Sequence, residues 1–101
     1  MITVFEAQPT FLAKWGTNGS GNGQFSNPFA LALDGVGNLY VADSVNNRIQ
    51  KFDSAGNFIL GWGSTGSGDG QFTSLSSLAI DGNNNVYATD SGAHRVQKFD
   101  S

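Results

Sequence analysis

An aspartate and an arginine flank the same kind of short turn twice in this 101-residue chain. Asp43 comes five positions before Arg48, and Asp90 comes five positions before Arg95. If each turn joins two antiparallel strands, the two side chains of a pair lie opposite each other. One interpretation is a carboxylate for acid–base catalysis, and the other is a charge-assisted hydrogen bond that holds the turn. Because the pair occurs in both places, we predict a structural role for all four residues and no catalytic residue.

The second candidate for chemistry is His94, the only histidine of the chain. A zinc lyase needs several ligands around one ion, and a single chain supplies one imidazole. Copies of His94 from three chains would lie too far apart for bonds of about 2 Å to one metal. The stretch 81–85 imitates the oxygen spacing of a calcium loop, but the glycine and the acid that should follow are missing. We therefore predict no metal and no cofactor.

These residues belong to a repeat that fills most of the chain. Residues 11–54 align with residues 58–101 at an offset of 47, and about half of the 44 aligned pairs are identical. Trp15 and Trp62 are one such pair. Because large aromatic side chains dominate the packing of cores and interfaces, we predict that both tryptophans pack between neighbouring repeats.

Each repeat contains short apolar runs separated by Asp, Gly, Asn and Ser. The runs that begin in the first repeat are 29–33, 39–42, 49–52 and 58–62. Such runs are typical of strands joined by tight turns, and none reaches the roughly 10–12 residues of a helix. Four antiparallel strands in a repeat of about 45 residues is the pattern of a β-propeller blade. The predicted fold class is therefore all-β, with two blades built as four-stranded antiparallel meanders.

Both repeats carry the same combination of turn and strand residues. It reads DGVGNLYVADSVNNRIQKFD in the first repeat and DGNNNVYATDSGAHRVQKFD in the second. This combination resembles the NHL-repeat family of β-propellers, and the resemblance covers most of the chain. The WD40 and kelch families are not supported, because the chain has neither a Trp-Asp pair nor a Gly-Gly doublet. The resemblance implies a ring of six blades.

Two blades alone leave sheet faces and strand edges in water, because stacked repeats bury their cores only against neighbours. If the ring has six blades, three chains complete it, and we predict a cyclic homotrimer. We assign residues 11–57 to the first repeat and 58–101 to the second. The outer strand at 11–15 is expected to complete a blade of another chain, and 1–10 to be a leftover strand. The alternatives are an excerpt of a longer propeller and a ring of another blade number.

A meander places its long loops, 17–24 and 64–71, on the same face as the turns 44–47 and 91–94. Loops on a rigid scaffold are frequent binding sites, and their amide side chains suit neutral polar ligands such as sugars or peptides. We predict a non-catalytic binding scaffold. Its predicted ligand-binding residues are Asn18, Asn22, Asn46, Asn47, Asp69 and His94.

The charge and hydropathy of the chain narrow the classes of partner. The net charge is −3, whereas nucleic-acid binding depends on Lys and Arg that neutralise phosphates. We expect no nucleic-acid partner, and no membrane partner either, because no apolar stretch approaches the roughly 18 residues that span a bilayer. The resemblance leaves two alternatives to the scaffold: a metal-assisted lyase or hydrolase of the peptidyl-hydroxyglycine amidating type, and an RNA-binding propeller.

Overall fold

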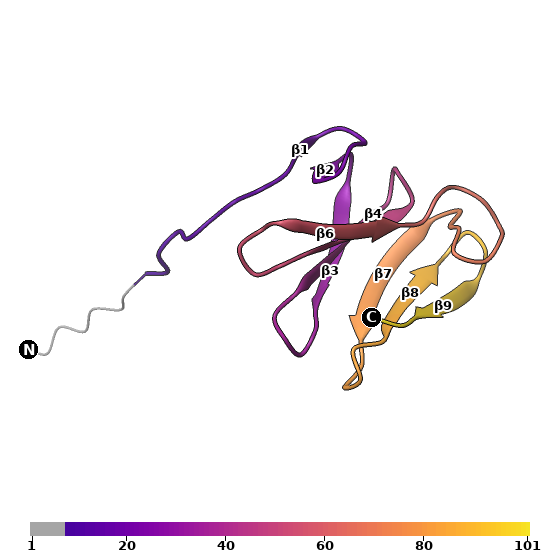
Figure 1. Cartoon of the computed structure of the whole chain (residues 1–101). Coiled ribbons are helices and arrows are strands. Elements are labelled where there is room, and N and C mark those ends of the chain that lie inside the picture. The colour runs from indigo at the N-terminus through magenta and orange to yellow at the C-terminus, as the bar shows by residue number, and fades with distance from the viewer. Residues whose placement is uncertain (1–7) are drawn as a thin grey trace, which may run out of the picture.

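The computed structural model describes residues 8–101 of the chain, and its elements are strands joined by turns and loops (Figure 1). Four strands pair in chain order to form one antiparallel sheet, which we call blade 1: β3 (Pro28–Leu33), β4 (Leu39–Asp43), β5 (Arg48–Phe52) and β6 (Phe58–Trp62). Three further strands form blade 2: β7 (Leu75–Ile80), β8 (Val86–Asp90) and β9 (Arg95–Phe99). The predicted all-β meanders are confirmed.

Aspartate side chains fix the turns between the strands. In the turn between β3 and β4, one carboxylate oxygen of Asp34 accepts hydrogen bonds from the backbone N–H groups of Val36 and Asn38, at 3.0 and 2.9 Å. Asp53 and Asp81 bind the backbone of their own turns in the same way. An aspartate that satisfies the backbone of a tight turn favours the turn over continued strand. The recurring Asp residues therefore set where each strand ends.

The core of the molecule lies between the two blades. Side chains on alternate positions of a strand point to opposite faces, so each sheet offers one apolar face to the other. The residues buried in this junction are Tyr40, Ala42, Ile49, Phe72, Leu75, Val86 and Ala88. Trp62 of β6 lies between the blades, with ring centroids 6.1 Å from Tyr40 and 5.5 Å from Phe99. Trp62 therefore packs between neighbouring repeats, as predicted.

The opposite face of blade 1 is open in the single chain. Leu31 and Leu33 of β3 are 65% and 63% exposed. The residues at the equivalent positions of blade 2, Leu78 and Ile80, pack against the core instead. The same apolar pattern is thus buried in one repeat and exposed in the other, because only blade 2 has a neighbour on that side.

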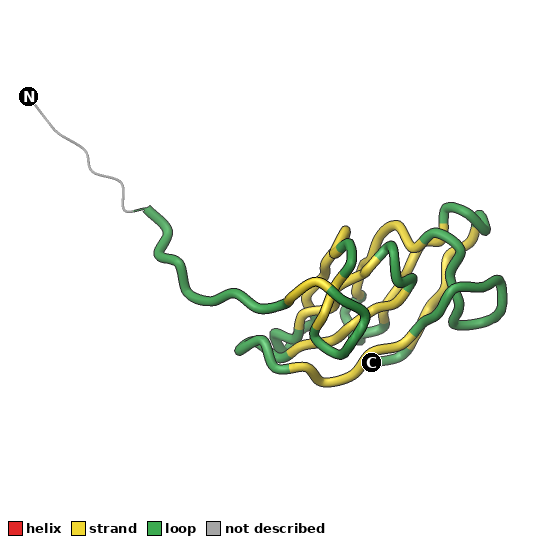
Figure 2. Tube along the Cα trace, turned by 90° about the horizontal axis from the view of Figure 1, so that it is seen from above, coloured by secondary structure: helices red, strands yellow, loops and turns green. Residues whose placement is uncertain are grey.

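Residues 8–16 form an extended segment whose N-terminal part runs away from both sheets (Figures 1 and 2). Phe11 and Leu12 are largely exposed, and the predicted outer strand at 11–15 pairs with no strand among residues 8–101. Trp15, at the end of this segment, contacts Phe52 of blade 1 with ring centroids 6.1 Å apart. Part of the predicted leftover strand, residues 1–7, lies outside the described residues. Residues 8–101 include no helix of the length and hydropathy needed to cross a membrane.

Candidate functional site

A long loop precedes each blade and folds over one end of its sheet. In the first loop, β1 (Thr17–Asn18) and β2 (Gln24–Phe25) form a short parallel pair. The guanidinium of Arg48 donates hydrogen bonds to three backbone carbonyls of this loop: those of Ser20, Gly21 and Gln24. Arg48 of β5 therefore holds the loop through the loop's backbone carbonyls. This places the tip of the loop beside the turn between β4 and β5.

Gln50 is a second anchor of this loop, and the sequence analysis did not single it out. Its side chain is 1% exposed, accepts a hydrogen bond from the Gly23 N–H at 2.8 Å and donates one to the Gln24 carbonyl at 2.7 Å. Gln97 makes the same two bonds in the second loop, to Gly70 and Gln71. The signal was present in the sequence, because the glutamine recurs inside the shared run QKFDS.

Asp43 anchors the other end of the loop. Its carboxylate is fully buried and accepts hydrogen bonds from the backbone N–H groups of Ser26 and Asn27, both at 2.9 Å. The predicted direct hydrogen bond between Asp43 and Arg48 is wrong. The two residues do face each other across β4 and β5. However, Asp43 accepts from the Asn27 N–H, and Arg48 donates to the Gln24 carbonyl. Both side chains bond the loop backbone, so the partners that they have differ from the predicted ones.

The second repeat repeats this arrangement. Arg95 donates to the carbonyls of Ser67, Gly68 and Gln71, and the Asp90 carboxylate accepts from the N–H groups of Thr73 and Ser74. The Arg95 Nε lies 4.0 Å from an Asp90 oxygen, a distance that allows an ion pair but is beyond hydrogen-bond distance. In each repeat the hydrogen bonds of the aspartate and of the arginine therefore go to different parts of the loop.

The electrostatics of these aspartates agree with a structural role. Burial raises the pKa of Asp90, but hydrogen bonds from Thr73, Ser74 and Ala93 outweigh it and lower the pKa to about 2. The pKa of Asp43 is lowered in the same way: burial opposes the shift, while bonds from Ser26, Asn27 and Asn46 cause it. A carboxylate whose oxygens already accept hydrogen bonds and whose pKa is lowered is poorly matched to proton transfer near neutral pH.

Two of the six predicted ligand-binding residues have partners inside the chain. Asn47 is 6% exposed, and its side chain bonds Thr65 and Leu75 at the blade junction. Asn46 donates to the Asp43 carboxylate at 2.8 Å. The structure corrects both assignments, because these amides bond other parts of the chain and stabilise the fold.

The other four candidates, Asn18, Asn22, Asp69 and His94, are exposed. Asn22 and Asp69 occupy equivalent positions at the tips of the two long loops. His94 occupies the position of Asn47, and both have left-handed backbones, with φ of 53° and 49°. The loops and the turns between the second and third strands share one face, as predicted, because Asn46 contacts Gly19 and Ser26.

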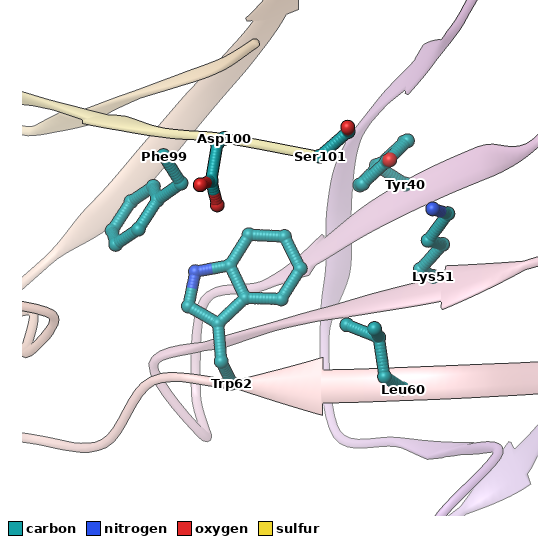
Figure 3. Close-up of a pocket in the computed structure, with 7 residues that line it drawn as sticks. All are labelled: Tyr40, Lys51, Leu60, Trp62, Phe99, Asp100 and Ser101. Carbon is teal, nitrogen blue, oxygen red and sulfur yellow. The ribbon is translucent and has the colours of Figure 1, made fainter. Parts of the chain in front are cut away.

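A cavity of about 260 Å³ opens at the edge of the blade junction, away from these loops (Figure 3). Its lining residues are Tyr40, Lys51, Leu60, Trp62, Phe99, Asp100 and Ser101. The Lys51 ammonium lies 5.3 Å from the centre of the Tyr40 ring. None of the six predicted ligand-binding residues lines this cavity. Within residues 8–101, no three His, Cys, Asp or Glu side chains converge as metal ligands would.

Two antiparallel blades packed face to face, each with its loop clamped by Asp, Arg and Gln, define a β-propeller protein. Residues 32–101 match the sequence profile of a domain family described as a 6-bladed beta-propeller, and the chain belongs to this family. The NHL-repeat resemblance is confirmed by curated relatives. The mouse NHL repeat-containing protein 3 is 44% identical over 45 residues, which cover 43% of this chain and 13% of that protein.

Two nematode proteins are similar over slightly shorter stretches of the chain. The B-box type zinc finger protein ncl-1 of Caenorhabditis elegans is 46% identical over 43 residues, and protein lin-41 of the same organism is 43% identical over 42. These matches cover 43% and 42% of this chain, but 5% and 4% of the relatives. The chain thus matches a small part of each relative.

Proposed function

We propose that this chain is a non-catalytic propeller module that assembles with copies of itself and serves as a binding scaffold. The observation that carries the proposal is the apolar face of blade 1, against which no other blade packs within residues 8–101. It presents Leu31, Leu33 and a groove lined by Trp15, Phe25 and other apolar side chains. An exposed apolar surface of this kind marks an interaction site.

The internal junction indicates what fits this face. Blade 2 meets blade 1 through side chains that sit 47 positions after those on the open face. A second copy that offers its blade 2 to this face would therefore repeat a contact that already exists within the chain. Val96, on the free face of blade 2, is 62% exposed, and the same contact between copies would bury it. A head-to-tail contact of this kind closes into a ring when its rotation permits.

The extended segment 11–15 provides a second contact between copies. Its equivalent, β6 (Phe58–Trp62), is the outer strand of blade 1 and pairs with β5. Shifting this pairing by 47 residues places segment 11–15 of one copy beside β9 of another. The backbone of β9 then gains the partner that β5 already has. Six blades at two per chain give a trimer.

The mass of the protein in solution tests the assembly. Light scattering at micromolar concentration is expected to give three times the 10.6 kDa of one chain. A mass of one chain at that concentration would remove the proposal. A mass of another multiple would retain self-assembly but change the number of blades in the ring.

The binding face of the scaffold is the one that carries the long loops. Asn22 and Asp69 are exposed at the tips of two clamped loops, so a trimer presents alternating amides and carboxylates around one face. We propose a neutral polar ligand, such as an oligosaccharide or a peptide backbone. A glycan and peptide array is the screen, with an N22A/D69A variant as control. Hits that bind the variant equally would contradict this part of the proposal.

A further inference from the structure

The junction between blades 1 and 2 contains a polar contact of defined geometry. Asn47 donates through Nδ2 to the Thr65 hydroxyl at 3.1 Å, and its Oδ1 accepts from the Leu75 N–H at 3.2 Å. Asn47 is buried, and its left-handed φ of 49° directs the side chain from the turn of blade 1. One side chain therefore satisfies one donor and one acceptor of the next blade.

At a junction between copies, the three positions equivalent to these residues carry other residue types. The changes on the two sides of that junction are chemically complementary. His94 takes the place of Asn47, Asn18 takes the place of Thr65, and Pro28 takes the place of Leu75. Proline has no N–H to donate, so nothing at this site requires the acceptor that Asn47 provides. A neutral imidazole has one donor and one acceptor nitrogen, and the Asn18 amide accepts or donates in return.

We infer that His94 of one copy inserts between Asn18 and Pro28 of the next copy and fixes the register of the ring. The imidazole hydrogen-bonds the Asn18 amide, and its ring packs on the flat face of Pro28. The inference rests on the self-assembly proposed above and names the contact that specifies it. This inference assigns His94 and Asn18 to assembly, whereas the sequence analysis assigned both to ligand binding.

The backbone already suits this contact. His94 has a φ of 53°, close to that of Asn47, so its side chain leaves the turn in the same direction. Pro28 pairs with Asp43 at the bulge where Leu75 pairs with Asp90. Both sides of the proposed contact are accessible, because His94, Asn18 and Pro28 are exposed in the single chain.

A double-mutant cycle tests the match between the two sides. H94N leaves an amide oxygen without a donor, and P28L adds an N–H that His94 is not placed to accept. Each is expected to weaken assembly about tenfold, the size of one unsatisfied buried polar group. The double variant recreates the internal Asn–Leu contact and is expected to recover most of the loss. Sedimentation equilibrium measures the assembly constants, with S54A as a surface control on a distant turn.

Asparagine is the appropriate replacement because it tolerates a left-handed backbone, whereas alanine would add strain at a φ of 53°. Additive losses in the cycle, in a wild type that still assembles, would overturn this inference and leave the proposed function standing. A monomeric wild type would overturn both. Urea unfolding of each single variant is measured at a protein concentration low enough for the wild type to dissociate. An unchanged midpoint relative to the wild type verifies that the blades themselves are unchanged.

A third junction contact supplies a gain-of-function test. The Gly35 N–H donates to the Asn84 side chain at 2.9 Å across the internal junction. Gly37 takes the place of Asn84 in the first repeat, so Gly82 of a neighbouring copy finds no side chain there. Gly37 has a φ of 89°, and a Cβ at this position meets nothing within 4 Å. G37N is expected to tighten assembly about fivefold, and no gain would count against the shifted register.

Discussion

Arg48 and Arg95 act on backbone carbonyls, and this determines what their loss would do. Each guanidinium donates to three carbonyls of one loop, so a single side chain replaces several bonds to water. Arginine suits this task because its donors form a rigid planar fork. At the scale of the residue, the shape of each long loop therefore depends on an arginine at the start of a strand, Arg48 of β5 or Arg95 of β9.

Replacement of Arg48 tests this role. Arg48→Ala is expected to lower the free energy of unfolding by about 1.5–3 kcal/mol, because hydrogen bonds from a charged group are lost and three carbonyls need new partners. Urea denaturation measures the change. Arg48→Lys is the matched control: it keeps the charge but not the fork, and we expect it to restore less than half of the loss. A loss within 0.5 kcal/mol, which is about the usual surface effect, would contradict the assignment.

Aspartate pKa values predict how stability responds to acid. The hydrogen bond from the Asn85 backbone, with others from the Asn85 side chain, Tyr87 and Asn83, lowers the pKa of Asp81 to about 2, although burial opposes the shift. Asp90 also has a pKa about 2. A lowered pKa contributes stability that is complete above the unfolded value of about 4 and is lost as the pH falls toward 2.

We therefore expect the urea midpoint to be constant from pH 7 to about pH 5 and to fall between about pH 4 and pH 2. Asp81→Asn removes one of the titrating groups, so the fall should become shallower while stability at pH 7 is reduced. A midpoint that does not change between pH 5 and pH 2 would contradict the two pKa values.

At the scale of the element, the strands are alike in both repeats, and the segments between them decide how blades meet. Gly63 follows β6 with a φ of 105°, and a Cβ there would lie 2.9 Å from the Asn47 carbonyl oxygen and 3.1 Å from the Arg48 Cα. The outer strand of blade 1 can enter the second loop only because this residue has no side chain.

Two glycines of this loop give a matched comparison. Gly70 also has a positive φ, 74°, but a Cβ there meets nothing within 4 Å. Gly70→Ala is expected to cost about 1 kcal/mol from backbone strain alone. Gly63→Ala adds the clash with backbone atoms and is expected to cost about 3 kcal/mol. Thermal and urea unfolding compare the two, and equal losses would show that the junction accommodates a methyl group at Gly63.

At the scale of the whole molecule, the open face of blade 1 is the feature that the proposed assembly must explain. Leu31→Glu places a charge at its centre and is expected to give a mass of one chain, since burial of an unpaired charge opposes the contact. Val45→Glu is the control, because Val45 is similarly exposed but lies on a turn. Sedimentation compares both with the wild type, and assembly of the Leu31 variant would remove this face from the contact.

The sequence predicts the strands better than it predicts the partners of individual side chains. Segment 58–62 was placed correctly as a strand, and the other strands of both blades were placed to within a few residues, because strands and tight turns depend on neighbouring residues. The structural role of Asp43 and Arg48 was predicted, but their partners were not. The partners of Arg48 lie 24 to 28 residues earlier in the chain, and Gln50 was missed for the same reason.

The alternation of apolar and polar residues and the 47-residue repeat are local and periodic, so the sequence by itself determined the strands, the turns and the membership of a propeller family. Only the tertiary structure decided which face of each strand is buried and where each polar side chain finds its partner. Asn47 shows why: nothing near it in sequence reveals that it bonds Leu75, 28 residues away. Such contacts exist only after two sheets pack, and packing depends on the geometry of the whole chain.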